Sequence, residues 1–454
     1  MSCISSNKDG ENFPEHSLGK DIRQYARLSL CVTAIGLAFP AHAIDFGQDG
    51  LFSVTGFTEL QFGRANNQCP GATCQISPET DRQRVWADAV VQGLPLSSSG
   101  TSFNQAQLWF KVKKDLGGGF KLKGEMSQKW RDGRQDVPGI WPERNLSIQH
   151  EEYGVLTIGE TVSRTWQFAD YPYGSNLGLS YAWASTGAGY RHLGNAIRYT
   201  SRVFDVSGGD AVFEVTYDRG NSAFKINKPR FVELWAHYGK GPLSVDAMYQ
   251  NTRNGVPAAF GSAAFNGPFY DAAADGKLGN SGQSVAVVQA VYQLNKKVEL
   301  SAGVRHNRWS GAYQAVALAG PPVQWNFPFN VDWFGVDANG VAHPGYPAQS
   351  TDLSLGARYR MDKWIFAAGA AYFSKASTPN PADRGQSNSA LVNTLQATYD
   401  YGNGFEFSVF SGMVNYSKKG LSPLSLPSNS TFNKIDSRTT KSGNWFGVGA
   451  KYTF

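Results

Sequence analysis

Apolar and polar residues alternate with a period of two in segments of about ten residues, from Leu51 to the end of the chain. This is the period of a β-strand with one apolar face. The last segment is the clearest, because one face carries only apolar residues and the other carries Trp445, Gly447, Gly449, Lys451 and Thr453. The predicted strands are 51–63, 104–114, 120–131, 145–153, 155–160, 195–202, 211–218, 229–238, 243–252, 284–294, 297–308, 352–361, 363–374, 389–401, 404–416 and 443–454.

The connections between these segments are of two kinds. Very short turns join the strands in pairs, and long polar, Gly-rich stretches separate the pairs at 65–103, 161–193, 253–282, 309–350 and 417–443. About 16 antiparallel strands with short turns at one end and long loops at the other are typical of a transmembrane β-barrel. The pattern therefore predicts an all-β barrel with short periplasmic turns and long extracellular loops.

Composition agrees with such a barrel and excludes a helical membrane protein. The mean hydropathy is −0.35, hydrophobic residues make up 41% of the chain, and aromatic residues make up 13%. A barrel has this profile because every second strand residue faces the aqueous lumen and aromatic residues gather at the membrane interfaces. Composition alone leaves a secreted soluble β-protein as an alternative.

The N-terminal segment predicts export. Residues 28–39 form an apolar run preceded by Lys20, Arg23 and Arg27, and Ala41-His42-Ala43 fits the small-residue cleavage pattern. We expect 1–43 to be a secretory signal and 44–454 to be one barrel domain. The removed segment holds four basic and four acidic residues, so the mature chain keeps the net charge of +6.

Several segments occur in the order found in a known family. They are 153–160 (YGVLTIGE), 195–201 (NAIRYTS), 238–245 (YGKGPLSV) and the terminal strand. In these segments the chain resembles the trimeric general porins of Gram-negative bacteria, of the betaproteobacterial type. The resemblance implies an outer-membrane location, a homotrimer, and a third loop, Thr161–Leu193, folded into the lumen. It also implies that Phe454 is read by the barrel-assembly machinery. The chain departs from the family at Glu160, where a basic residue is usual.

Charged residues with inward parity are the candidates for ion selectivity, because rings of charge control passage through pores. Basic residues outnumber acidic ones among them, which predicts a mild anion preference. We expect Lys113 and Lys121 at the rim and Lys111 and Arg198 on the pore wall, while some of these bases could instead bind lipopolysaccharide phosphates. The candidates for the pore lining or constriction are Lys111, Lys123, Lys129, Arg198, Arg358, Glu59, Glu125, Glu160, Arg164 and Asp170.

Other chemistry finds little support in the sequence. Cys69 and Cys74 flank a Pro-Gly turn and are expected to form a small disulfide in an exported protein. His150-Glu151 begins a zinc-protease motif, but Gly154 stands where the second His is needed. We expect no enzyme, no metal, no cofactor and no nucleic-acid partner.

Three functions remain open at this stage. The leading one is passive diffusion of small hydrophilic solutes. The second is a substrate-selective channel for organic anions or phosphate, and the third is an adhesin built on the same barrel. Trp109 and Trp235 have inward parity, but they are too few to form an aromatic path of the kind that sugar-specific channels use.

Overall fold

The computed structural model describes residues 44–46, 51–67, 101–131, 134–135, 141–169, 187–220, 222, 225–226, 228–254, 265, 282–310, 347–375, 377, 389–417 and 442–454. Cys69, Cys74 and Asp170 lie outside these residues, as does the predicted signal segment. Within them, no helix is long and apolar enough to cross a membrane.

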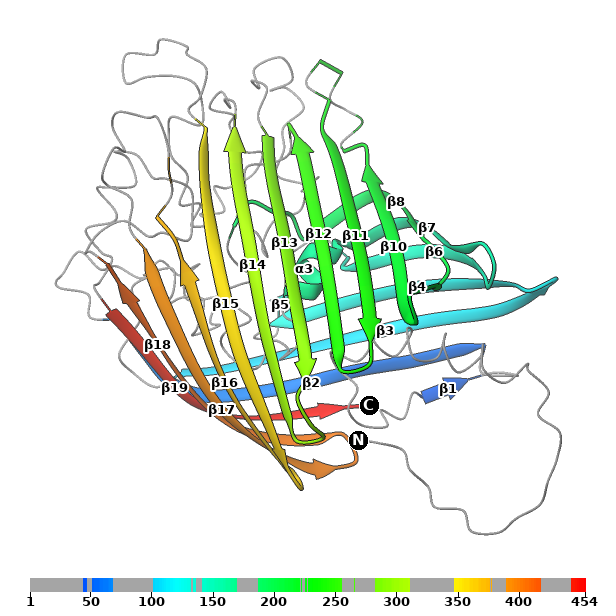
Figure 1. Cartoon of the computed structure of the whole chain (residues 1–454). Coiled ribbons are helices and arrows are strands. Elements are labelled where there is room, and N and C mark those ends of the chain that lie inside the picture. Colours follow the sequence, from blue (N-terminus) through cyan, green and yellow to red (C-terminus); the bar gives the residue numbers. More distant parts are fainter. Residues whose placement is uncertain are drawn as a thin grey trace.

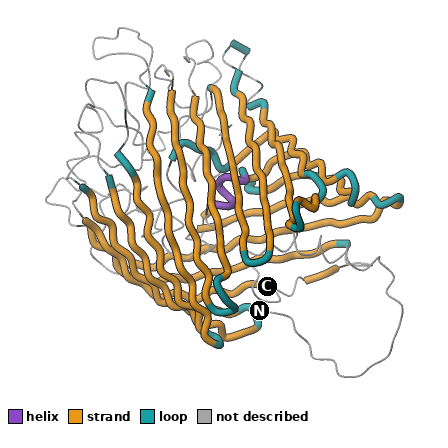
Figure 2. The backbone as a smooth tube through the Cα atoms, in the orientation of Figure 1, coloured by secondary structure: helices purple, strands orange, loops and turns teal. Residues whose placement is uncertain are grey.

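Antiparallel strands build the described structure, with one short helix (Figures 1 and 2). Sixteen of the described strands are long, with 8 to 17 residues, and three are short, with two or three. The long strands are β2 (Phe52–Asn67), β3 (Thr101–Gly117), β4 (Phe120–Arg131), β6 (Glu143–His150), β7 (Gly154–Val162), β8 (His192–Thr200), β10 (Gly209–Asp218), β11 (Arg230–Lys240), β12 (Leu243–Arg253), β13 (Gly282–Gln293), β14 (Val298–Ser310), β15 (Ala348–Met361), β16 (Trp364–Phe373), β17 (Ala390–Gly402), β18 (Phe405–Tyr416) and β19 (Ser442–Thr453). The other elements are β1 (Ile44–Phe46), β5 (Arg134–Gln135), β9 (Phe204–Val206) and the helix α3 (Arg164–Ala169).

The sheet closes on itself between its last and first long strands. β19 pairs with β2 from Gly443↔Asn67 to Thr453↔Phe57. The register continues beyond the strand, since the N–H of Phe454 donates to the carbonyl of Gly56 at 3.0 Å and the N–H of Gly56 donates back at 2.9 Å. The predicted barrel, and the pairing of the terminal residue with the first strand, are therefore confirmed.

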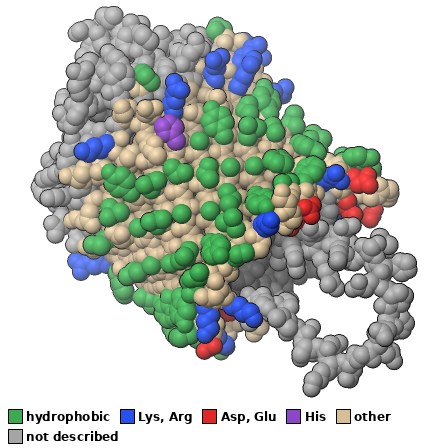
Figure 3. Space-filling view, in the orientation of Figure 1, with side chains coloured by type: hydrophobic (Ala, Val, Ile, Leu, Met, Phe, Trp, Pro, Cys, Tyr) green, Lys and Arg blue, Asp and Glu red, His purple; other side chains and the backbone are tan. Residues whose placement is uncertain are grey.

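The two faces of the wall differ as the alternation predicted. Apolar side chains such as Phe62, Ile158 and Leu355 are more than half exposed on the outside, while polar side chains such as Gln250 and Thr216 are fully buried on the inside. Figure 3 shows hydrophobic side chains in rows across the wall, with Lys and Arg mostly at its edges. An apolar exterior and a polar interior are the arrangement that a barrel needs in a lipid bilayer.

The predicted strand positions agree with the structure in most places. β4 has the predicted bounds, whereas the strand expected at 145–153 is β6 and ends earlier, because residues 151–153 form the turn to β7. The short strands β1, β5 and β9 and the helix α3 were not predicted. β1 pairs with β2 at Ile44↔Val54, beyond the end of β19, and so extends the closing seam.

Candidate functional site

The helix α3 follows β7 and lies inside the ring of strands (Figure 2). Its first turn meets the carboxylate of Glu233, which projects from the inner face of β11. Oε1 accepts the N–H of Arg164 at 2.7 Å, and Oε2 accepts the N–H of Thr165 at 2.9 Å and its hydroxyl at 2.7 Å. The first N–H groups of a helix have no partner within the helix, and a carboxylate satisfies them and the positive end of the helix dipole. Glu233 thus caps α3 from the wall.

A second wall carboxylate binds the arginine that begins the helix. Glu214 of β10 accepts two hydrogen bonds from Arg164, from Nε at 2.8 Å and from Nη2 at 2.9 Å. Two parallel bonds to one carboxylate are the strongest geometry that an arginine offers. Burial alone lowers the pKa of Arg164, but Glu214 and Glu233 outweigh burial and raise it. Arg164 is therefore a fixed charge that attaches α3 to β10.

Arg198 of β8 has the predicted inward direction but a different surrounding. It is 5% exposed and donates to the Thr161 hydroxyl at 3.0 Å and to the Val162 carbonyl at 2.7 Å. Its Nε also lies 3.0 Å from Glu214. Arg198 therefore lies on the inner wall, but it is a buried charge held by Glu214 and by Thr161 and Val162 at the end of β7, where loop 3 (residues 161–193) begins.

Apolar contacts hold the other side of the helix. Phe168 stacks on Trp235 with 5.1 Å between ring centroids, and both belong to a buried cluster with Val212, Met248, Val285 and Val287. Gln289 of β13 donates to the Phe168 carbonyl at 2.8 Å. Trp235 has the inward direction that its parity predicted, but it packs under α3.

The return segment of loop 3, residues 187–193, crosses further along the same wall. The N–H of Ala188 donates to Asn307 of β14 at 3.0 Å. Tyr190 is fully buried; its N–H donates to Gln250 of β12 at 2.9 Å, and its hydroxyl donates to Gln283 of β13 at 2.6 Å. The described parts of loop 3 therefore lie against β10 to β14, which confirms for these residues that the loop folds into the lumen.

Elsewhere on the inner wall, most of the predicted charges have partners. The Nζ of Lys111 lies 4.0 Å from Oε1 of Glu125, and Nη2 of Arg358 donates to Oε1 of Glu299 at 2.6 Å. The carboxylate of Glu59 accepts hydrogen bonds from Gln61 and Gln105. Lys129 is 7% exposed, and Lys123 has the inward parity of Lys121 and Glu125 on β4.

Sequence reasoning did not single out four residues of this wall. Glu214, Glu233 and Glu299 bind the arginines Arg164, Arg198 and Arg358, and Arg305 is 1% exposed with its Nη2 2.9 Å from Asp352. Their inward direction could be predicted from the alternation, but the paired residues are 16 to 69 positions apart in the chain, and only the folded register brings them together.

Glu160 is placed differently from its expected pore-lining position. It lies opposite Arg144 in the register of β6 and β7, in line with the outward pair Leu146↔Ile158, and it accepts a hydrogen bond from Arg144. Side chains directly opposite on antiparallel strands share a face. The Arg144–Glu160 ion pair therefore belongs to the outside of the barrel.

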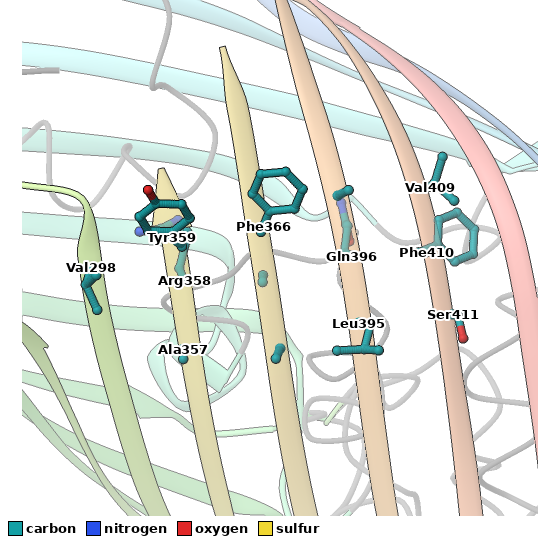
Figure 4. A pocket seen from close by; sticks show the side chains of 13 residues that line it. Val298, Ala357, Arg358, Tyr359, Phe366, Leu395, Gln396, Val409, Phe410 and Ser411 are labelled. Atoms are coloured by element: carbon teal, nitrogen blue, oxygen red, sulfur yellow. The ribbon is translucent and has the colours of Figure 1, made fainter. Parts of the chain in front are cut away.

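A groove on the outside crosses β14 to β18 (Figure 4). Ala357, Ala368 and Ala397 line it, and larger side chains such as Tyr359, Phe366 and Leu395 surround them. This apolar surface faces away from the lumen and suits lipid chains better than a polar solute. In the described part of the chain, no group of three His, Cys, Asp or Glu side chains is arranged to hold a metal ion.

Comparison with known proteins agrees with this geometry. The family model "Gram-negative porin" matches residues 33–320. The structure is similar to the anion-selective porin from Comamonas acidovorans (13% identity, TM-score 0.53, 89% of this chain and 100% of that chain). It has the same TM-score, 0.53, with OmpF from Salmonella typhi in complex with daunomycin (15% identity) and with OmpT of Vibrio cholerae (11% identity). Each of these two matches covers 90% of this chain and 100% of the other chain. Comparison with curated protein sequences gave no match.

A closed wall with an apolar exterior and a polar interior, and with a loop fixed inside it, defines an outer-membrane channel. The chain belongs to the Gram-negative porin family.

Proposed function

We propose that the protein is a homotrimeric porin that passes small hydrophilic solutes and ions by passive diffusion, with a mild preference for anions. A lumen of 16 long strands is too wide for side chains alone to fill, and loop 3 narrows it from the side of β10 to β14. The anion preference rests on one observation, the row of inward lysines on β3 and β4 at positions 111, 113, 121 and 123. Among the described residues, only Lys111 of these four lies within 4.0 Å of a carboxylate oxygen. The outer wall faces lipids and lipopolysaccharide.

The trimer has support from one structural relative. OmpT of Vibrio cholerae folded in vitro was solved in a form described as a trimer, and this chain matches that structure at 12% identity with a TM-score of 0.52. Light scattering of the purified protein measures the mass directly. Three chains per particle is the expected result, and a monomer at all concentrations would contradict the proposal.

We also propose export through the general secretory pathway with cleavage before Ile44, and assembly by a machinery that reads Phe454. β1 begins at Ile44 and pairs with β2, so a mature chain that starts there retains this strand. Sequencing the N-terminus of protein taken from outer membranes tests the cleavage, and a mature N-terminus well inside β2 would refute it.

Conductance and solute uptake test the channel itself. Purified protein in a planar bilayer is expected to give stepwise conductance, and liposomes that contain it are expected to swell in small sugars. Stable insertion without conductance would refute the proposal and would favour an adhesin. The proposed lumen residues are charged residues of the inner wall, Lys111, Lys123, Lys129, Arg358, Glu59 and Glu125, of which Lys129 and Glu59 are buried within that wall.

A further inference from the structure

Two lysines face each other directly on the inner wall. In the register of β3 and β4, Lys113 is the partner of Lys123, and the neighbouring rows pair Lys111 with Glu125 and Asp115 with Lys121. The adjacent residues Phe110, Val112 and Met126 are exposed on the apolar outside, so the lysines project to the lumen. Directly opposite residues of an antiparallel pair have Cβ atoms about 5 Å apart.

Neither lysine has a carboxylate that serves it alone, because Glu125, which attracts Lys123, also pairs with Lys111. Glu125 lies 4.0 Å from Lys111, and Asp115 accepts the N–H of Gly117 at 2.7 Å in the turn. Among the described residues, no carboxylate forms an ion pair with Lys113 or Lys123. Like charges directly opposite each other destabilise a sheet, so an anion between them would remove an unfavourable interaction.

The position of this pair separates it from loop 3. Lys123 comes four residues after the turn at Gly119, about 13 Å along the strand. The turn belongs to the short-turn end of the barrel, which is the periplasmic end in this class. Loop 3 lies against β10 to β14, so the lysine pair lies on a different part of the wall.

We propose that Lys113 and Lys123, supported by Lys111 and Lys121, form a binding site at the periplasmic mouth for a small oxyanion with two negative charges, of which hydrogen phosphate is the simplest. This proposal rests on the proposed function, because the anion reaches the site through the lumen. Each ammonium group offers three donors, and a phosphate offers several acceptor oxygens and a charge that matches the two lysines. Chloride carries one charge and matches only one of them.

The test is block of chloride current by inorganic phosphate. Wild-type channels are held in constant KCl, and phosphate is added first to one side of the bilayer and then to the other. Phosphate is expected to reduce the current at a lower concentration from the side of the short turns. Lys113→Gln and Lys123→Gln are each expected to raise the half-blocking concentration about tenfold, because each removes a hydrogen bond to a charged group. Lys363→Gln, in the turn between β15 and β16 at the same end of the barrel, is the matched control and is expected to leave it unchanged.

A second readout keeps the site testable without conductance. Phosphate that binds the folded barrel raises the unfolding temperature relative to chloride at equal ionic strength, and this shift is expected in the wild type and in K363Q but not in K113Q or K123Q. Chloride conductance without any phosphate block, or equal block in all four proteins, would overturn the site and leave the porin function standing. Absence of conductance together with a phosphate shift that only the two lysine variants lose would overturn the porin function and leave the site standing.

Discussion

Glu233 gives the sharpest test of how loop 3 is held in the lumen. Replacement by Gln keeps the shape of the side chain but turns one oxygen into an N–H donor and removes the charge. If the amide oxygen takes the Oε2 position, it still accepts the hydrogen bonds from Thr165 and Gln250. The new NH₂ group then faces the backbone N–H of Arg164, which in the wild type donates to Oε1 at 2.7 Å. The other orientation sets the NH₂ group against three donors, so the first is preferred.

The cost can be estimated from this geometry. One buried donor loses its acceptor, which costs about 1–3 kcal/mol, and the negative charge 3.9 Å from Arg198 is lost as well. Arg198 and Arg164 still form their ion pairs with Glu214 in the variant. The free-energy cost of the substitution therefore stays below the roughly 3–5 kcal/mol that is typical of a fully broken buried ion pair. A local loss of about 2.8 kcal/mol raises the population of detached loop 3 about 100-fold.

Single-channel recording measures that population. Glu233→Gln is expected to show a larger mean conductance, more current noise and a changed voltage threshold for closure. Glu406→Gln is the control, because it makes the same charge change on the inner face of β18 without a described contact to α3. If Glu233→Gln behaves like Glu406→Gln in all three properties, the role of Glu233 as the cap of α3 is refuted.

Two further predictions concern packing. Phe168→Ala removes the ring that stacks on Trp235, at a cost of about 3–5 kcal/mol. It is expected to enlarge the conductance and to make Trp235 fluorescence quenchable by iodide, and unchanged quenching would contradict the packing of α3 on the wall. Gly56→Ala brings a Cβ within 2.9 Å of the Phe454 ring and is expected to lower the yield of heat-resistant folded barrel in gel electrophoresis, whereas Gly124→Ala, whose nearest atom is 3.8 Å away, is expected to fold normally. Equal yields for the two alanine variants would show that close packing at the seam does not limit assembly.

The strands could be predicted because their information is local. Alternation over 120–131 gave the bounds of β4 and the direction of Lys121, Lys123 and Glu125. The closing contact of Phe454 also followed, since a barrel must join its last strand to its first.

Loop 3 could not be predicted in the same way. Its residues do not alternate, and its structure depends on Glu233, which is 69 positions from Arg164, and on Asn307, which is 119 positions from Ala188. Parity correctly gave the inward direction of Arg198, but parity says nothing about what covers a side chain. For Glu160, alternation with Ile158 indicates the outside, and the expectation of a pore-lining role came from the family position instead.

The reversal potential of the purified channel in a gradient of KCl tests the central claim most directly, that the lumen is an aqueous path with an excess of positive charge on its wall. With the concentrated solution on one side, anion preference gives a reversal potential of the sign set by chloride diffusion, and Lys111→Gln is expected to shift it toward zero. A potential of the opposite sign, set by potassium, would contradict the account.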